Sequence, residues 1–299
     1  MAREVLKEDI PKIKQLLFMV FGKDDFKDIF RMGGLTNHTY KITMTDNKEY
    51  VVRIPGEGTE EMIVRSDEKI STKLACRLGI DAETLYFGDD GSKVTKYIPN
   101  AITMSSELLH QEKHIQQVAE IFKKLHSCGI DTGVPFEVFE MAAGYEKIIF
   151  YNKVTMFDDY FEKKKEVMQI KNEIDSATVI KKVPCHNDPL CENWVKGNGK
   201  MYLIDWEYAG MNDGMWDVAD ISIEASFDNE CDEKLLTAYL GHMPEIIDKK
   251  KFLAYKIYVD YLWTLWAKAR VPYDGQPMED WAKERYIRLK GFIDDYRKL

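Results

Sequence analysis

Hydrophobic and polar residues alternate along residues 28–54, in runs rich in Val, Ile, Thr and Tyr that are separated by a turn at residues 46–48. A period of two is typical of strands that bury one face. A Gly-Gly pair at residues 33–34 interrupts the first run, and residues 93–98 (KVTKYI) return to strand character before Pro99. We therefore predict a small antiparallel sheet in the first hundred residues.

Apolar residues recur every three or four positions over most of the remaining chain, which is the period of an amphipathic helix. Residues 60–78 have this pattern, and they precede the last predicted strand. Further helices are predicted over residues 107–127, 140–175, 232–241, 248–270 and 278–297. The fold class is therefore α+β, with an N-terminal lobe at residues 1–98 and a mainly helical C-terminal lobe at residues 99–299. A cleft between two such lobes is a natural place for a ligand.

Composition narrows the class of protein and of partner. The 299 residues are 45% hydrophobic and 12% aromatic, enough for an ordinary globular core. A formal net charge of −9 disfavours nucleic acid and anionic lipid as partners and is compatible with a cationic small molecule. No run of about 18 apolar residues occurs, acids interrupt the first residues, and the five cysteines form no CxxC pair. We expect a cytoplasmic protein with reduced thiols.

The strongest chemical signal lies in residues 179–208, VIKKVPCHNDPLCENWVKGNGKMYLIDWEY. Asn198-Gly199 between short apolar runs is a strong hairpin signal. Asn193 lies five positions before this turn and Asp205 six positions after it, so strand pairing would bring their side chains together. One amide oxygen and one carboxylate suffice for Mg²⁺ when ATP supplies further oxygens. We predict a magnesium site at the open end of the hairpin.

Asp188 stands five residues before Asn193, in a loop that Pro189 stiffens. This is the spacing of a kinase catalytic loop, in which the Asp accepts the proton of the substrate hydroxyl. Asn and Asp are also ordinary loop residues, but Asp188, Asn193 and Asp205 together favour function. His186 is interpreted as a structural residue that braces the loop.

The segments HNDPLCEN and LIDWEYAGMNDGMWDVADISIE closely resemble the signature of the choline/ethanolamine kinase family, in particular its bacterial choline kinases. The resemblance implies a protein-kinase-like fold in two lobes, with Asp188 as catalytic base and with Asn193 and Asp205 on magnesium. Aminoglycoside phosphotransferases share those three residues, but they lack the longer tail of Glu207, Tyr208, Trp216, Asp217 and Glu224.

The phosphates of ATP have a candidate binding loop in GGLTNHTYKI. Gly33 and Gly34 would let the backbone approach the phosphates, and Thr36 and Asn37 could donate hydrogen bonds, as the resemblance to the family's loop suggests. By itself a Gly-Gly pair between strands favours a simple turn, and its position before a strand that ends in Arg53 is what favours a phosphate-binding loop.

The other nucleotide-binding candidates follow in the same lobe. Arg53, in YVVRIPG, falls where protein kinases carry the lysine that pairs with ATP. The resemblance to the family implies an arginine in place of that lysine. Glu68 is the acid expected to pair with it, although other helix acids are close by. The resemblance also places the backbone groups of Lys96 and Ile98 against the adenine. A surface cation is the alternative interpretation of Arg53.

The residues predicted to bind the acceptor alcohol favour choline as that alcohol. A quaternary ammonium cannot donate an N–H hydrogen bond, so a selective site uses aromatic faces and diffuse negative charge. Trp263 and Trp266 are three residues apart and share a helix face. Tyr208, Trp281 and Glu224 complete the predicted site, the last two by resemblance. An aromatic stripe at helical spacing is also typical of a packed core, and this alternative stays open.

These observations predict an enzyme that uses ATP and Mg²⁺ to phosphorylate the hydroxyl of choline by direct in-line transfer, with Asp188 as base. Ethanolamine, another amino alcohol or an aminoglycoside is the alternative acceptor. A nucleotide-binding pseudokinase that acts as an interaction module is a further alternative. The intact set of Asp188, Asn193 and Asp205 argues against it.

Overall fold

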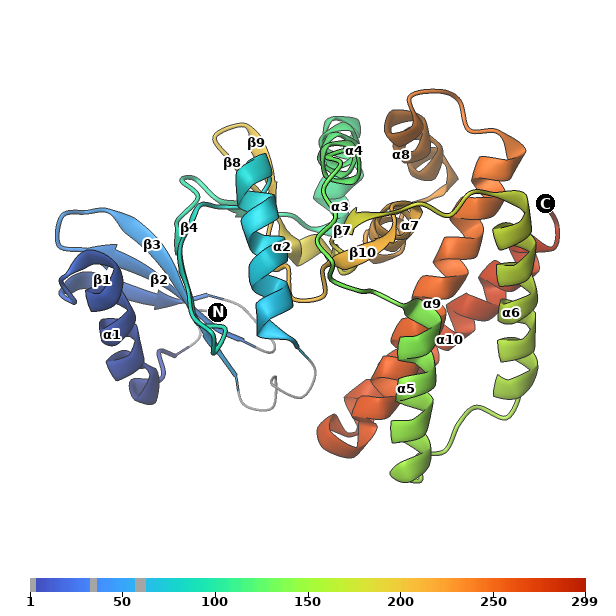
Figure 1. Ribbon diagram of the computed structural model, residues 1–299, viewed down its shortest axis with the longest axis horizontal. Coiled ribbons are helices and arrows are strands. Elements are labelled where there is room, and N and C mark those ends of the chain that lie inside the picture. Colours follow the sequence, from blue (N-terminus) through green and yellow to red (C-terminus); the bar gives the residue numbers. More distant parts are fainter. Residues whose placement is uncertain (1–3, 33–36, 57–62) are drawn as a thin grey trace. The chain divides into compact units, whose positions relative to one another are not determined.

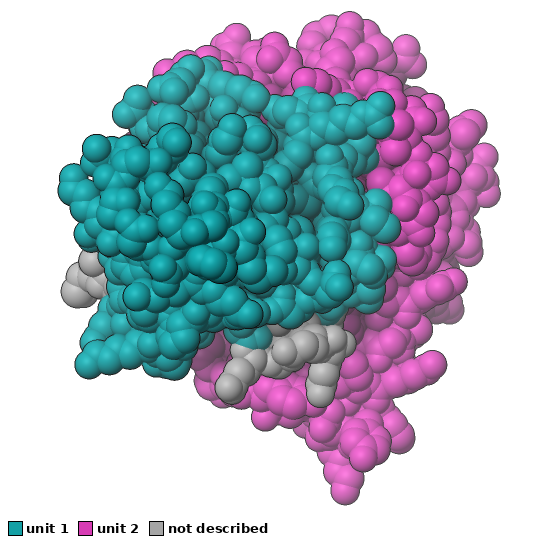
Figure 2. Space-filling view, turned by 60° about the vertical axis from the view of Figure 1, so that its left-hand side comes forward, with its two compact units in different colours: residues 1–104, 192–209 teal, residues 105–191, 210–299 magenta. Residues whose placement is uncertain are grey.

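A computed structural model of the chain describes residues 4–32, 37–56 and 63–299. The chain divides into two compact units (Figure 2). Unit 1 comprises Met1–Met104 and Glu192–Ala209, and unit 2 comprises Ser105–Cys191 and Gly210–Leu299. The functional division predicted between residues 98 and 99 stays a prediction.

Unit 1 contains a five-stranded sheet whose neighbouring strands all pair antiparallel, in the order β1-β2-β3-β5-β4 (Figure 1). This confirms the small antiparallel sheet predicted from the alternating residues. The strands are β1 (Phe26–Arg31), β2 (Asn37–Met44), β3 (Glu49–Pro55), β4 (Thr84–Phe87) and β5 (Lys93–Lys96).

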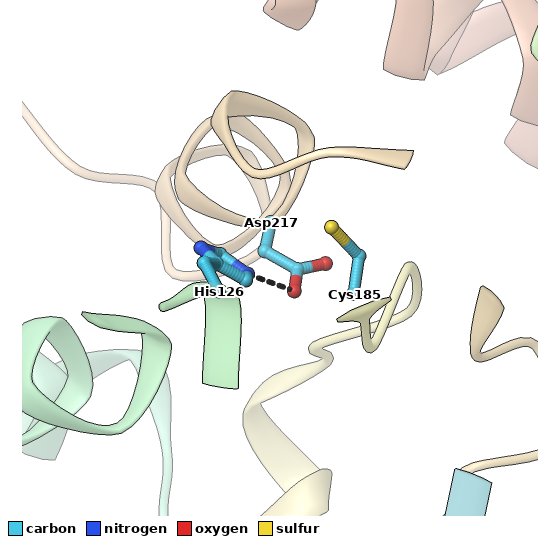
Figure 3. A group of neighbouring side chains, drawn as sticks. All are labelled: His126, Cys185 and Asp217. Carbon is cyan, nitrogen blue, oxygen red and sulfur yellow. Dashed lines mark hydrogen bonds and ion pairs between the residues drawn. The ribbon is translucent and has the colours of Figure 1, made fainter. Parts of the chain in front are cut away.

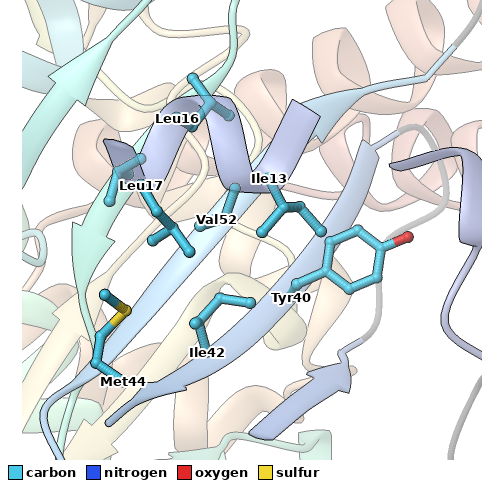
Figure 4. Packing of buried hydrophobic residues seen from close by; sticks show 8 residues of the cluster. Ile13, Leu16, Leu17, Tyr40, Ile42, Met44 and Val52 are labelled. Atoms are coloured by element: carbon cyan, nitrogen blue, oxygen red, sulfur yellow. The ribbon is translucent and has the colours of Figure 1, made fainter. Parts of the chain in front are cut away.

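Helix α1 (Ile10–Phe21), which the sequence analysis did not predict, covers one face of this sheet (Figure 4). Its Ile13, Leu16 and Leu17 pack in one cluster with strand residues that include Tyr40 and Val52, and each of these side chains is at most 1% exposed. Full burial of one such aliphatic side chain stabilises the fold by about 1.5–3 kcal/mol. The sheet of unit 1 therefore owes its buried face to a helix that precedes it in the chain.

A second, three-stranded sheet of unit 1 joins distant parts of the chain in the order β6 (Ile102–Thr103), β8 (Trp194–Gly197), β9 (Lys200–Leu203). The predicted hairpin is present, because β8 and β9 pair antiparallel around Asn198 and Gly199. Both turn residues have positive φ, 51° and 79°, as a type I′ turn requires. The local turn chemistry therefore fixes the register of the two strands.

Unit 1 also contains helix α2 (Arg65–Leu78), which ends at Gly79 in the left-handed conformation. The helix begins later than the predicted start at residue 60, since Ile63 and Val64 are not helical. α2 carries Glu68, and its first turn presents that side chain inward, where it is 1% exposed.

Unit 2 is mainly helical, as predicted, and it holds a small antiparallel sheet of β7 (Lys182–Cys185) and β10 (Gly210–Asp213). α9 is its central element and contacts α5, α6, α7 and α10. The helices are α3 (Ser106–Leu109), α4 (Glu112–His126), α5 (Val138–Tyr151), α6 (Tyr160–Ala177), α7 (Met215–Glu224), α8 (Asn229–Leu240), α9 (Ile246–Asp274) and α10 (Gln276–Tyr296).

Two of the predicted helices are divided in the structure. Residues 140–175 form α5 and α6, because the chain leaves the helix at Asn152 and Lys153 adopts a positive φ of 54°. Residues 107–127 contain the end of α3 and then α4. Within the part of the chain that the structure describes, no helix is both long and apolar enough to cross a bilayer.

Candidate active site

The loop that follows β7 carries His186, Asn187 and Asp188, and α7 holds its backbone in place. The fully buried carboxylate of Asp217 accepts two backbone hydrogen bonds, from the amide of His186 at 2.8 Å and from the amide of Asn187 at 2.7 Å. A buried carboxylate that accepts backbone N–H groups is a strong anchor. α7 therefore fixes the loop immediately before the predicted catalytic Asp188.

A second layer of contacts supports this anchor (Figure 3). His126 of α4 lies 3.0 Å from Asp217 through its Nε2 atom, and its Nδ1 atom lies 2.9 Å from the hydroxyl of Tyr239. Asp188 donates its amide hydrogen to Nδ1 of His186 over 3.3 Å. This contact is the bracing role expected of His186.

His126, Cys185 and Asp217 lie close enough together to resemble a metal site, with one potential ligand atom of each within 4.8 Å of the others. A thiol must lose its proton to bind metal strongly. Burial raises the pKa of Cys185 well above its ordinary value, and nearby acids add to this effect. Asp217 is also engaged by the loop amides. We interpret the group as a structural support for the loop.

Asn187 completes the fixed part of the loop, in a left-handed conformation with φ of 66°. Its carbonyl accepts the indole N–H of Trp216 at 3.1 Å, and its side-chain oxygen accepts the amide of Asn212 at 3.1 Å. The carbonyl of Asp188 accepts the amide of Leu190 at 2.9 Å. Asp188 thus extends from a rigid backbone, while its own side chain is partly exposed.

In unit 1, the structure brings together Arg53 of β3 and Glu68 of α2, as expected. Arg53 Nη1 lies 2.5 Å from Glu68 Oε1, and Arg53 Nη2 donates to the carbonyl of Gly91 at 2.9 Å. Burial opposes ionisation of Glu68, but the charge of Arg53 outweighs it and lowers the pKa of the Glu68 carboxyl. The pair is therefore ionised and positions the guanidinium.

Asn193 and Asp205 lie at the base of the hairpin, where the amide of Ile204 donates to the carbonyl of Asn193 at 2.9 Å. Asp205 has a positive φ of 68°, and its side chain is about one-third exposed. Arg53 Nη1 is 3.4 Å from Asp205 Oδ1. The predicted metal ligands thus flank the β8–β9 pair of unit 1, one just before β8 and the other just after β9.

The charge balance of this cluster fits a divalent cation. Burial raises the pKa of Glu207 to about 7, and repulsion from Asp205 adds to the rise. A raised pKa means that the positive charge around the Glu207 carboxyl does not compensate for its burial and for the neighbouring acid. An amide oxygen from Asn193 and a carboxylate from Asp205 are also the donor types that Mg²⁺ takes. The residues present therefore fit the expected metal.

Arg65 and Glu207 belong to the same cluster, although the sequence analysis gave neither a role in the nucleotide site. Arg65 Nη1 lies 2.7 Å from Glu68 Oε2 and 3.5 Å from Glu207 Oε2. The amide of Asn37 also donates to Glu207 at 3.1 Å. The i, i+3 spacing of Arg65 and Glu68 is a signal that sequence reasoning could have used.

The structure describes only some of the remaining residues predicted to bind the nucleotide. Gly33, Gly34 and Thr36 lie outside the described residues. The amide of Lys96 donates to the carbonyl of Glu83 at 2.9 Å, so an adenine contact here would need another backbone group. Ile98 packs against Gly197, where an added Cβ would lie 2.3 Å from the Ile98 methyl group.

The acceptor candidates of unit 2 form a continuous row of rings. The centroids of Trp263 and Trp266 are 6.1 Å apart, and those of Trp266 and Trp281 are 5.8 Å apart, both edge to face. Trp263 is only 4% exposed, whereas Trp266 and Trp281 are partly exposed. Trp263 thus has the burial of a core residue, whereas parts of the Trp266 and Trp281 side chains reach the surface.

Glu224 joins this row through Arg285 of α10. Arg285 Nη2 donates to Glu224 Oε1, and its guanidinium lies 4.1 Å from the centroid of the Trp281 ring. Nη1 of the same side chain lies 3.1 Å from Asp260, which is fully buried. The structure therefore places Glu224 beside the aromatic row. Tyr208, the other ring predicted for the acceptor, belongs to unit 1.

Known proteins of one family are similar to this chain in sequence. The family model for choline/ethanolamine kinase matches residues 29–267. LicA of Haemophilus influenzae Rd is 29% identical over 260 residues, covering 84% of this chain and 96% of that protein. A probable ethanolamine kinase of Arabidopsis thaliana is 27% identical over 297 residues, covering 86% and 78%.

Solved structures extend the similarity to the fold. The choline kinase LicA of Streptococcus pneumoniae superposes with a TM-score of 0.82 at 28% identity, covering 97% of this chain and all of that one. A choline/ethanolamine kinase family protein of Mesorhizobium loti gives 0.83 at 30% identity, covering 96% and 94%. An aminoglycoside phosphotransferase at 18% identity, with a TM-score of 0.65, shares the fold alone. The predicted protein-kinase-like fold is confirmed.

Proposed function

The chain belongs to the choline/ethanolamine kinase family and is a small-molecule alcohol kinase, and we propose that it transfers the γ-phosphoryl group of ATP to the hydroxyl of choline. The observation that carries the choice of acceptor is the aromatic row of unit 2 beside Glu224. We propose that the enzyme acts in the cytoplasm.

Choline suits such a site because of its chemistry. Its quaternary ammonium has no N–H to donate, so aromatic faces and nearby carboxylates supply the attraction. Trp266 and Trp281, which are partly exposed, are the proposed ring faces, and Glu224 is an adjacent acid that is paired with Arg285. Trp263 supports Trp266 edge to face from a buried position. We propose Tyr208 as an additional ring, contributed by unit 1.

The nucleotide is assigned to unit 1. Family membership implies ATP use, and a LicA structure with 28% identity to this chain is described as a complex with AMP. The ion pair with Glu68 fixes the position of the Arg53 guanidinium, which we propose neutralises phosphate charge. Asn193 and Asp205 would hold Mg²⁺. When bound, the ion would neutralise charge on the phosphate oxygens.

Asp188 is the proposed catalytic base. Its carboxylate orients the acceptor hydroxyl and takes its proton as the oxygen attacks phosphorus in line with the leaving group. The hydrogen bonds from the loop amides to Asp217 keep Asp188 from shifting. Phosphoryl transfer needs little covalent help from the protein, so this positioning supplies much of the rate enhancement.

The test is ATP consumption across a panel of choline, ethanolamine and an aminoglycoside. Choline is expected to have the highest kcat/KM. Preference for ethanolamine would contradict the choice of choline but retain the alcohol kinase. Absence of phosphorylation of every amino alcohol would contradict the proposed function as a whole.

Replacing Trp266 by Ala is expected to raise the KM for choline about 2- to 30-fold, because one ring face contributes roughly 0.5–2 kcal/mol to binding of a cation. The KM for ATP should stay unchanged, since the nucleotide candidates belong to unit 1. Steady-state kinetics with each substrate varied in turn measures both values.

The matched control is Trp263→Ala, on the same helix face but in a buried position. A core tryptophan cut to Ala costs about 3–5 kcal/mol of stability, so this variant should melt at a lower temperature. If the Trp266 variant behaved in the same way and lost activity towards every acceptor alike, Trp266 would be a core residue and not a part of the site.

A further inference from the structure

Asp220 is a buried acid whose carboxylate accepts no hydrogen bond from the residues that the structure describes. It lies on α7 and is 1% exposed. Asp217, three residues earlier on the same helix, is equally buried but accepts several hydrogen bonds. The two acids thus differ in pairing and not in burial.

The surroundings of Asp220 are rich in negative charge. Burial raises the pKa of its carboxyl well above the usual range, and the charges of Glu224, Asp188 and Asp217 add to the rise. Arg285 is the cation that opposes them. A further cation next to Asp220 would favour its ionised form by the same rule.

Arg285 forms its ion pairs with acids other than Asp220. One of its terminal nitrogens pairs with Glu224 and the other with Asp260. Glu224, the acid predicted for the acceptor site, is therefore largely neutralised by a resident cation. An incoming cationic group would have to find its counter-charge elsewhere, and Asp220 lies one helical turn from Glu224 on the same face of α7.

Two donors of the same group of residues are also without partners. Nε of Arg285 and the indole Nε1 of Trp266 are buried, with no hydrogen-bond partner in the described chain. A buried polar group without a hydrogen-bond partner destabilises the folded state. The oxygens of Asp220 and the two donors of Arg285 and Trp266 do not bond to one another. This pattern indicates a binding place for a polar ligand, because the polar groups of a packed core ordinarily pair with each other.

We propose that Asp220 is a specificity-determining residue of the acceptor site, whose carboxylate supplies the negative charge that balances a cationic acceptor while Glu224 stays paired with Arg285. The inference rests on the proposed function, because it assumes a cationic alcohol as substrate. It predicts that the site recognises the charge of the acceptor through Asp220 and its shape through the tryptophan rings.

The test compares choline with 3,3-dimethylbutan-1-ol, its uncharged carbon isostere, in the Asp220→Asn variant. Asn keeps the volume and removes the charge. The KM for choline should rise about 10- to 100-fold, because the change removes a unit charge at close range from the cation in a buried site. The KM for the neutral alcohol should stay unchanged. An unaltered ratio of the two KM values would overturn the proposal.

Stability provides the second readout, with Asp217→Asn as the matched control on the same helix. The surroundings of Asp220 disfavour its ionised form and its oxygens accept no hydrogen bond in the described chain, so Asp220→Asn should melt at the same temperature as the parent or higher. Asp217→Asn should melt lower, because it weakens the anchor of the loop. A lower melting temperature for Asp220→Asn, with both acceptors affected alike, would show a structural role and refute the assignment.

The same assay separates this inference from the proposed function. If the parent enzyme phosphorylated no cationic alcohol, the proposed function would fail before Asp220 was tested. If the parent used choline and the Asp220→Asn variant bound it equally well, only the role of Asp220 would fail.

Discussion

Replacing Asp188 by Asn is expected to lower kcat by about 10²- to 10⁴-fold, the usual contribution of a positioned base. Asn keeps the size of the side chain and its ability to contact the acceptor hydroxyl, but it cannot take the proton. The loop itself should not move, because its anchors are backbone amides and Asp217. Single-turnover phosphorylation of choline measures the loss directly.

Binding of ATP is the internal control for this variant. The nucleotide candidates Arg53 and Glu68 belong to unit 1, so the dissociation constant for ATP should stay within about twofold, well under 1 kcal/mol. The melting temperature should also be unchanged. A variant that retained most of its turnover would remove Asp188 from the catalytic role and leave the loop as a structural feature.

The hairpin of unit 1 could be predicted from sequence because its signal is local. Asn198 and Gly199 are residue types that tolerate positive φ, and the type I′ turn demands positive φ at both positions. Once the turn is fixed, strand pairing determines where Asn193 and Asp205 lie. The prediction that Asn193 and Asp205 form a magnesium site thus depended on the Asn198-Gly199 turn.

Helix α7 could not be predicted in the same way. Each residue from Met215 to Ile223 is buried, so the helix lacks the polar face that gives an amphipathic pattern its period. Three acids lie inside it, and acids ordinarily indicate exposed positions. Tertiary contacts explain two of them, since Asp217 accepts hydrogen bonds from the loop amides and Glu224 accepts one from Arg285.

Arg285 and Asp220 were missed for the same reason, because both are charged residues at buried positions of a helix. Arg285 follows Trp281 by four positions and Asp220 precedes Glu224 by four, so each lies on the same helix face as a predicted site residue. Charged residues in helices are mostly solvated, which made both appear unremarkable. Helical spacing from an already chosen residue would have been a usable signal.

The break between α5 and α6 has a different reason. The segment from Asn152 to Asp159 contains no proline or glycine, so the composition carries no strong stop signal. The helix ends because Asn152 caps it and Lys153 enters the left-handed region at φ of 54°. A lysine in that conformation is uncommon, and only the tertiary structure reveals it.

Replacing Asp205 by Ala is expected to lower kcat/KM for ATP by at least about a hundredfold at moderate magnesium concentration, because it removes a charge as well as a ligand from the proposed metal site. The fold should survive. Arg53, the cation beside Asp205, keeps its ion pair with Glu68 and its bond to the carbonyl of Gly91. No buried charge is left unpaired by the change.

Asn193→Ala is the matched variant, expected to be the milder of the two since it removes a neutral ligand. The variant keeps the backbone hydrogen bond of the hairpin in which the carbonyl of Asn193 accepts the amide of Ile204. Raising the magnesium concentration should recover part of the activity in both variants, and more in Asn193→Ala. If both variants gave the parent's magnesium titration curve, the base of the hairpin would not hold the metal, and Asp205 would act only as a neighbour of Arg53.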